Sequence, residues 1–306
     1  RLLLFICCQV AHGRVCMNSV PTRAPLIDKL VSGKARLFMI IDFHTHIFPD
    51  SLAPRTLPHL SKIAHDIPYH TDGTQTGALE AMRRWGFDYS VVLHIATKPG
   101  QARRINSFAC EVQAAHPQFL CFGSLHPADE DAPAVAAEIA GAGLYGVKLH
   151  PAYQNFQFGD ERYYPIYQAV CDCGLPLLLH AGRDPVAPGA NRAPAEEIAR
   201  VARAFPRLTI IAAHMGALGD CADASEHLCG LDNVYFDTAM SAPLLDPDAF
   251  RALLYKRGSD HVLFGTDCPW STAPDELALL RRVGVTGSDL ENILWKNAAC
   301  LLKLAL

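Results

Sequence analysis

The sequence lacks three features that would define its class at once. It has no Cys-x-x-Cys pair among its 11 cysteines and no excess of positive charge, since 27 Lys and Arg stand against 31 Asp and Glu. It also has no apolar run approaching the roughly 18 residues that span a bilayer. These absences argue against a disulfide-stapled secreted domain, a nucleic-acid partner and a membrane span. We therefore expect a protein of the reducing cytoplasm.

The 306 residues are half hydrophobic and 19% charged, which is typical of a globular protein with a large core. Residues 1–38 differ from the rest, because they hold six basic residues and one acidic residue and show no convincing periodicity. A short signal or transit peptide is one interpretation of this stretch. We favour an N-terminal extension outside the native working domain, which would then span residues 39–306.

Short β-branched or aliphatic runs recur from residue 39 onward, and each is followed by a stretch with helical spacing. Eight such units close into a barrel more readily than into an open sheet, so we predict an α/β fold of the (β/α)8 TIM-barrel type. A doubly wound sheet is the alternative, but no Gly-x-Gly-x-x-Gly follows any predicted strand. The predicted strands are 39–46, 90–96, 119–126, 146–151, 176–181, 208–215, 234–239 and 262–268.

Two segments of the predicted barrel stand out. Residues 47–76 form an exceptionally long gap after the first strand, rich in Pro, His, Asp and Thr, which predicts a lid or substrate loop on the carboxyl face. A final helix is predicted over 288–301, opened by a capping box between Ser288 and Glu291.

Histidines gather at the carboxyl ends of the predicted strands, where TIM barrels build their active sites. Within Asp42–His46, alternation along the strand places His44 and His46 on one face, directed into the barrel. Three neutral imidazoles and one carboxylate from this rim suit Zn²⁺ or a similar divalent ion and leave a position for water. The histidines at or near the strand ends are His44, His46, His94, His126, His150, His180 and His214, and the carboxylate candidate is Asp267 on the last strand.

As an ordered set these motifs resemble the amidohydrolase superfamily, and within it the amidohydrolase-related group that contains aminocarboxymuconate semialdehyde decarboxylase. The resemblance covers about residues 39–304. It is carried by His44-x-His46, Gly-Val-Lys-Leu-His-Pro at 146–151, His180 with Ala-Gly, His214 with Met-Gly, and Gly-Thr-Asp at 265–267.

The resemblance implies one divalent metal ion held by His44, His46, His180 and Asp267, with Zn²⁺ expected first and Mn²⁺, Fe²⁺ or Co²⁺ also compatible with such a ligand set. It further implies that His214 polarises the substrate or moves protons, and that Asp267 doubles as an acid or base. A second metal is expected only if Lys148 is carboxylated.

Other candidates stand around this centre. Lys148 alternatively pairs with Asp267 or with a substrate carboxylate, and His150 is a substrate contact or a support for a ligand. Arg55 in the long loop and Arg183 after the fifth strand are candidates to hold a substrate carboxylate. We expect His94, His126 and Asp237 to be structural or to support ligands, and Cys268 to serve packing.

Three functions remain open. The leading expectation is a metal-dependent hydrolase, in which activated water attacks an amide, ester or lactone carbonyl. The alternative is a metal-dependent, non-oxidative decarboxylase of a small unsaturated or aromatic acid. Some decarboxylating relatives begin the first strand with Glu-x-His where this chain has His44, which tilts the expectation toward hydrolysis. The third is a non-catalytic binding barrel. The partner is a small molecule, possibly carboxylated, and the protein itself is expected as a homodimer.

Overall fold

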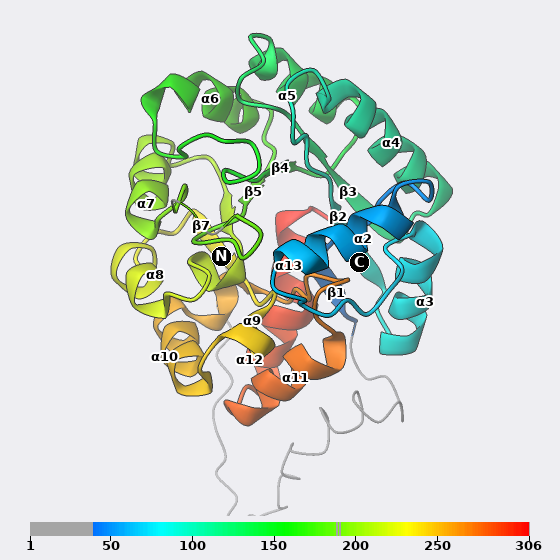
Figure 1. Ribbon diagram of the computed structural model, residues 1–306. Helices are drawn as coiled ribbons and strands as arrows, with labels where there is room; N and C mark the ends of the chain where they lie inside the picture. Colours follow the sequence, from blue (N-terminus) through cyan, green and yellow to red (C-terminus); the bar gives the residue numbers. More distant parts are fainter. Residues whose placement is uncertain (1–38, 188, 190, 306) are drawn as a thin grey trace, which may run out of the picture.

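The computed structural model describes residues 39–187, 189 and 191–305, so the predicted extension 1–38 lies outside the described residues. Eight parallel strands follow one another around a single sheet in the order of the sequence (Figure 1). The predicted (β/α)8 barrel is confirmed. The strands are β1 (Ile41–Thr45), β2 (Tyr89–Leu93), β3 (Phe119–Ser124), β4 (Val147–Leu149), β5 (Leu177–Leu179), β6 (Ile210–Ala212), β7 (Val234–Asp237) and β8 (Val262–Leu263).

Helices cover the outside of the barrel, and their amphipathic faces bury apolar side chains against the sheet (Figure 1). No helix among the described residues combines the length and apolar character needed to cross a membrane. The main helices are α2 (Ala53–Ile63), α3 (Gln75–Trp85), α4 (Ala102–Ala115), α5 (Ala132–Gly141), α6 (Tyr164–Asp172), α7 (Ala195–Ala204), α8 (Cys221–His227), α9 (Ser241–Leu244), α10 (Pro247–Arg257), α11 (Ala273–Arg282), α12 (Gly287–Glu291) and α13 (Asn297–Leu301).

The predicted last helix is present, but the predicted capping box is wrong. The helix begins at Gly287 with Thr286 as its N-cap, so Ser288 already lies inside the first turn. One π-helical segment, Asn292–Lys296, joins α12 to α13.

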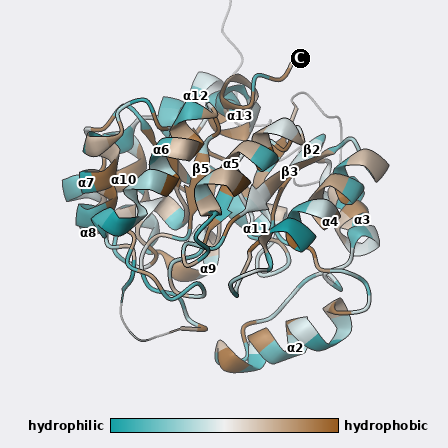
Figure 2. Cartoon of the chain, turned by 90° about the horizontal axis from the view of Figure 1, so that it is seen from above, coloured by the Kyte–Doolittle hydropathy of each residue, from teal (hydrophilic) through white to brown (hydrophobic). Residues whose placement is uncertain are grey.

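The long segment after β1 is not a simple loop, because α2 forms within it. Pro54 stands in the first turn, where a missing N–H costs nothing, but Pro58 inside the helix hides the helical signal in the sequence. Figure 2 shows α2 standing away from the other helices. Leu52, Thr56 and Leu60 line a cavity at the barrel mouth, so the segment does lie over the predicted carboxyl face.

Ten apolar residues, nine from strands and Ala213 directly after β6, fill the interior of the barrel below the mouth. They come from strands on opposite sides of the ring, such as β1 and β5, which can meet only across the interior. Ala298 and Leu302 join this cluster from the end of the chain. The ten are Ile41, Phe43, Val91, Leu93, Leu120, Phe122, Leu178, Ile211, Ala213 and Leu263.

The ring closes between the first and last strands through residues that follow the short β8. The Phe43 N–H donates to the Phe264 carbonyl and the His46 N–H to the Cys268 carbonyl, both at 2.7 Å, and the Asp267 N–H donates to the His44 carbonyl at 2.8 Å. Beneath this seam lies Asp42, which is fully buried. Its carboxylate accepts from the backbone N–H and hydroxyl of Thr266 at 2.9 and 2.6 Å.

Candidate metal centre

A shift in strand register directs the first two candidate ligands toward the mouth. Phe43 belongs to the interior cluster, so strict alternation would turn His44 away from it. The pairing of β1 with β2 shifts register between Asp42 and Thr45, and such an irregularity re-aims the following side chains. His44 and His46 therefore both line the cavity at the mouth. Gly265 leaves room for this arrangement, since a Cβ there would lie 3.1 Å from the Cβ of His44.

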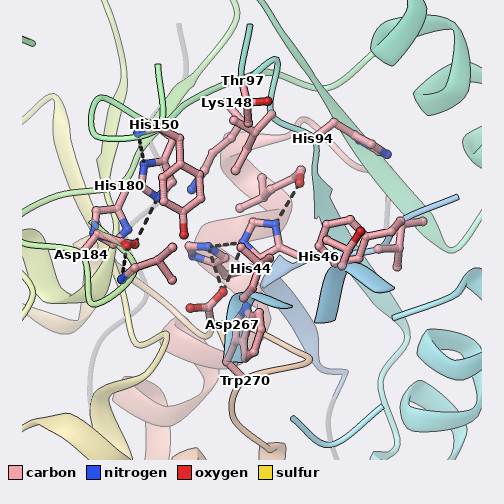
Figure 3. Close-up of a pocket in the computed structure, with 18 of the residues that line it drawn as sticks. His44, His46, His94, Thr97, Lys148, His150, His180, Asp184, Asp267 and Trp270 are labelled. Carbon is pink, nitrogen blue, oxygen red and sulfur yellow. Dashed lines mark hydrogen bonds and ion pairs between the residues drawn. The ribbon is translucent and has the colours of Figure 1, made fainter. Parts of the chain in front are cut away.

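Three donor atoms converge at this point (Figure 3). Nε2 of His44 lies 3.2 Å from Nε2 of His46, and the Asp267 Oδ1 lies 3.5 Å from the first and 3.2 Å from the second. A tetrahedral ion with bonds of about 2.1 Å holds its ligand atoms about 3.4 Å apart. The observed separations therefore fit one small divalent cation.

The protons of the two imidazoles lie on the nitrogens that face away from this point. Nδ1 of His44 is 2.8 Å from the Asp237 carboxylate, and Nδ1 of His46 is 3.0 Å from the Leu93 carbonyl. Both neighbours are acceptors, so each Nδ1 carries the proton and each Nε2 presents a lone pair. The buried Oδ1 of Asp267 has no hydrogen-bond partner among the described residues. Three electron pairs left facing one another are what a bound cation would satisfy.

Burial keeps His44 and His214 neutral. Desolvation, followed by the charge of Lys148, holds the pKa of His44 well below its usual value. Desolvation and then His180 lower the pKa of His214 to about 4. Burial also raises the pKa of Asp237 to about 6. The imidazoles of His44 and His214 are thus in the unprotonated form that coordinates metals.

The other predicted ligand, His180, does not join this group. Its Nδ1 lies 3.0 Å from Nε2 of His214, whose own Nδ1 is 3.1 Å from the Ala239 carbonyl. Nε2 of His180 is 3.7 Å from the Asp184 carboxylate. His214 thus lies between His44 and His180, and the four-ligand set with His180 stays a prediction.

His150 and Asp184 hold His180 in this position (Figure 3). The rings of His150 and His180 stack with centroids 4.4 Å apart, and Tyr153 stacks on the other face of His150 at 3.6 Å. The Asp184 carboxylate lies 3.3 Å from Nε2 of His150 and also accepts from the Val186 N–H at 2.7 Å. His150, predicted as a support, therefore contacts His180 directly.

Lys148 lies at the bottom of the same cavity and is 1% exposed. Asp237, Asp267 and Asp184 surround it, but no described carboxylate lies within the 4.0 Å of an ion pair with its ammonium group. The alternative in which Lys148 pairs directly with Asp267 is therefore wrong in this structure. Burial lowers the pKa of Lys148 to about 8.

The two arginines that we predicted to hold a substrate carboxylate do not lie near the three converging donor atoms. Arg55 and Arg183 are exposed and do not line the cavity. Arg55 faces outward from α2, and the guanidinium of Arg183 reaches the Gly189 carbonyl at 3.5 Å. Arg104 on α4, which sequence reasoning did not single out, lines the cavity instead.

Sequence reasoning also missed Asp184 and Tyr153. Asp184 follows His180 by four residues in Gly-Arg-Asp-Pro, and this proximity was the available signal. Burial, followed by the nearby charge of Asp184, raises the pKa of Tyr153. Asp237, expected only to be structural or to support a ligand, bonds His44 directly.

Replacing Asp237 with Asn should weaken metal binding by about 10- to 100-fold. The amide oxygen can still accept from the His214 N–H, but an amide NH₂ facing Nδ1 of His44 disfavours the tautomer that leaves Nε2 free. Competition with a fluorescent chelator measures the affinity. Asp172→Asn, at a surface ion pair with Arg207, is the matched control and should bind metal like the original protein. Equal affinity in all three proteins would contradict this role.

Comparisons with known proteins agree with the fold. A family model described as amidohydrolase matches residues 41–304. An uncharacterised TIM-barrel protein from Bordetella bronchiseptica is 23% identical, with a TM-score of 0.71, over 87% of this chain and 99% of that one. Among curated proteins, none matches the chain significantly.

Two further solved structures are named for an activity. The 5-carboxyvanillate decarboxylase of Sphingomonas paucimobilis is 18% identical, with a TM-score of 0.64, over 87% of this chain and 99% of that one. A dihydroxybenzoic acid decarboxylase from Polaromonas sp. JS666, solved with manganese and the inhibitor 2-nitroresorcinol, is 17% identical, with a TM-score of 0.67, over 88% and 98% of the two chains. Since the family model spans most of the sequence, the chain belongs to the amidohydrolase family.

Proposed function

We propose that the protein is a metal-dependent, non-oxidative decarboxylase of a small aromatic or unsaturated carboxylic acid. The observation that carries this proposal is the buried ammonium group of Lys148, set beside the three donor atoms without a carboxylate partner within 4.0 Å among the described residues. The names of the two decarboxylase neighbours support it as well. Hydrolysis, the leading expectation from the sequence, becomes the second candidate.

An unpaired cation buried in a cavity favours an anionic ligand. A buried charge without a partner costs several kcal/mol, and a substrate carboxylate or phenolate recovers part of that cost when it binds. A pKa of about 8 leaves most Lys148 side chains protonated at pH 7. A neutral amide, ester or lactone would not offer the same compensation.

His44, His46 and Asp267 would hold the metal, with His180 as the proposed fourth ligand. A bound divalent ion supplies positive charge that stabilises negative charge developing on the substrate oxygens. Lys148 binds the acid from below and fixes its orientation. Burial of the site excludes water from the reacting carbon.

The reaction needs one proton and no redox partner. The bond between the ring or vinyl carbon and the carboxyl carbon breaks, CO₂ leaves, and the electron pair remains on the former carbon. That carbon takes a proton that originates in solvent, and Asp267 or His214 is the candidate to relay it. Both side chains line the cavity, which makes them the candidates for this transfer.

Hydrolysis stays the second candidate because a metal held by His44, His46 and Asp267 alone would keep a coordination position for water. Turnover of candidate aromatic acids and carboxylated lactones in ¹⁸O-labelled water and in D₂O separates the two. Decarboxylation releases CO₂ and places one deuterium on the product carbon, without ¹⁸O in the remaining product. Incorporation of ¹⁸O into a product carboxylate would instead establish hydrolysis. Absence of both reactions would favour a binding barrel.

Removing the metal should abolish turnover and lower the melting temperature. A ligand at 100 times its dissociation constant stabilises the folded state by about 2.7 kcal/mol. Adding Mn²⁺ or Zn²⁺ back to the chelated protein should restore both properties, and the more effective ion identifies the working metal. His44→Ala should show no metal-dependent shift in melting temperature. Full activity in protein shown by elemental analysis to hold no metal would contradict the proposal.

Replacing Lys148 with Met should lower kcat/KM by about 10- to 100-fold, mostly through a higher KM. A hydrogen bond to a charged group contributes about 1.5–3 kcal/mol. The free energy of unfolding should stay equal or rise, because an apolar side chain of similar length replaces an unpaired buried charge. Steady-state kinetics and urea unfolding measure the two effects. An unchanged KM would show that Lys148 does not bind the substrate.

A further inference from the structure

The cavity at the barrel mouth has two ends of different chemistry. Its volume is about 680 Å³, which is in the range that takes a drug-sized molecule. The inner end carries the polar groups of the candidate metal centre together with Lys148 (Figure 3). The outer end lies between α2 and α4 and is lined mainly by apolar side chains.

One side of α2 faces this outer end. Leu52, Thr56, Leu60 and Ala64 line the cavity at intervals of four residues, which places them in a row along the helix. A neighbouring face of α2 buries Ala53 and Leu57 in the protein. The helix thus uses one face for packing and presents a second, mostly apolar face to open space.

The opposite wall is mainly apolar, although Arg104 of α4 also lines the cavity. Ile105 and Phe108 of α4 line the cavity, with Ile95 after β2 and Trp270 after β8. At the rim, Leu52 is 39% exposed and Leu244 of α9 is 40% exposed. Large apolar side chains on both sides of a cavity favour binding of an apolar ligand group, which removes them from water.

We infer that the substrate has two parts, an acid head held at the donor atoms and Lys148, and an apolar extension under α2 of about one further ring or a short alkyl chain. This inference rests on the proposed function for the head group alone. An acid with a single ring, bound at the inner end, would not reach the row of side chains that α2 presents to the cavity. The extension lies in the chamber formed by α2, Ile95, Ile105 and Phe108.

The test uses benzoate and its 4-ethyl, 4-butyl and 4-hexyl derivatives, titrated calorimetrically into the metal-loaded protein. Each buried methylene adds about 0.8 kcal/mol, so the dissociation constant should fall about threefold to fourfold per methylene until the chamber is filled. In Leu60→Gln the dependence on chain length should flatten, while the affinity for benzoate itself stays unchanged. Gln is a good helix former, and Leu60 is only partly buried, so α2 should persist.

Ile63→Gln is the matched control, because Ile63 is also on α2, is 41% exposed and does not line the cavity. It should reproduce the chain-length dependence of the original protein. Affinity independent of chain length, no binding by any member, or equal flattening in both variants would overturn the inference. Release of CO₂ from the same acids is measured separately. The binding data can therefore confirm the apolar chamber even if no CO₂ is released. CO₂ release can likewise confirm the proposed reaction even if affinity does not depend on chain length.

Discussion

Replacing Asp267 with Asn should lower kcat/KM by about 10³-fold, in the middle of the 10²- to 10⁴-fold range for a lost proton-transfer group. The substitution removes the carboxylate from the three converging donors and the candidate acid or base from the reacting carbon. The backbone of Asp267 has a φ of 65°, in the left-handed region that Asn tolerates as readily as Asp. The loss should therefore come from chemistry and leave the fold intact. Kinetics at saturating metal measure it.

Two controls accompany this variant. Its melting temperature without metal should match that of the original protein, and Asp172→Asn should keep full activity. Retention of more than about a tenth of the original kcat/KM at saturating metal would remove Asp267 from the reaction, since such a residue is worth at least 10².

Replacing Asp42 with Ala should lower the free energy of unfolding by about 3–5 kcal/mol, because each buried donor left without its acceptor costs about 1–3 kcal/mol. The carboxylate accepts from the His44 N–H at 3.1 Å and the Thr45 hydroxyl at 3.0 Å, in addition to both groups of Thr266. Its loss leaves four buried donors without their acceptor. Urea unfolding of the metal-free protein, extrapolated to water, measures the change.

Asp42→Asn should fall between the original and Asp42→Ala, because it keeps one acceptor oxygen but turns an NH₂ group toward donors. Asp172→Ala, at an exposed site, should change the free energy of unfolding by less than about 0.5 kcal/mol. An equally small change in Asp42→Ala would show that the Asp42 contacts add nothing to the closure of the barrel.

The barrel could be predicted because its strands are buried on both faces. Such strands appear in a sequence as short continuous apolar runs, and their regular recurrence with intervening helices has few other solutions. Helix α2 could not be predicted, since Pro54 and Pro58 mask it. It is held by its place over the barrel mouth, a tertiary effect that local propensity does not contain.

The donor group was partly visible in the sequence. Strand ends locate His44, His46 and Asp267 on one rim, and their meeting follows from the topology of a closed ring. The register shift that turns His44 inward, the close contact of His180 with His214 and the role of Asp184 depend on loop paths and on neighbours distant in sequence. Spacing alone does not encode those details.

The seam between the first and last strands determines when during synthesis the three candidate metal donors can first meet. The two imidazoles on one side of that seam are present once residue 46 has been translated, whereas the carboxylate on the other side is present only once residue 267 has been translated. During synthesis, a growing chain thus carries a pair of imidazoles without their third companion for more than 200 residues. A divalent ion held by all three donors would therefore bind only after almost the whole barrel has been translated, because the third donor follows the last strand.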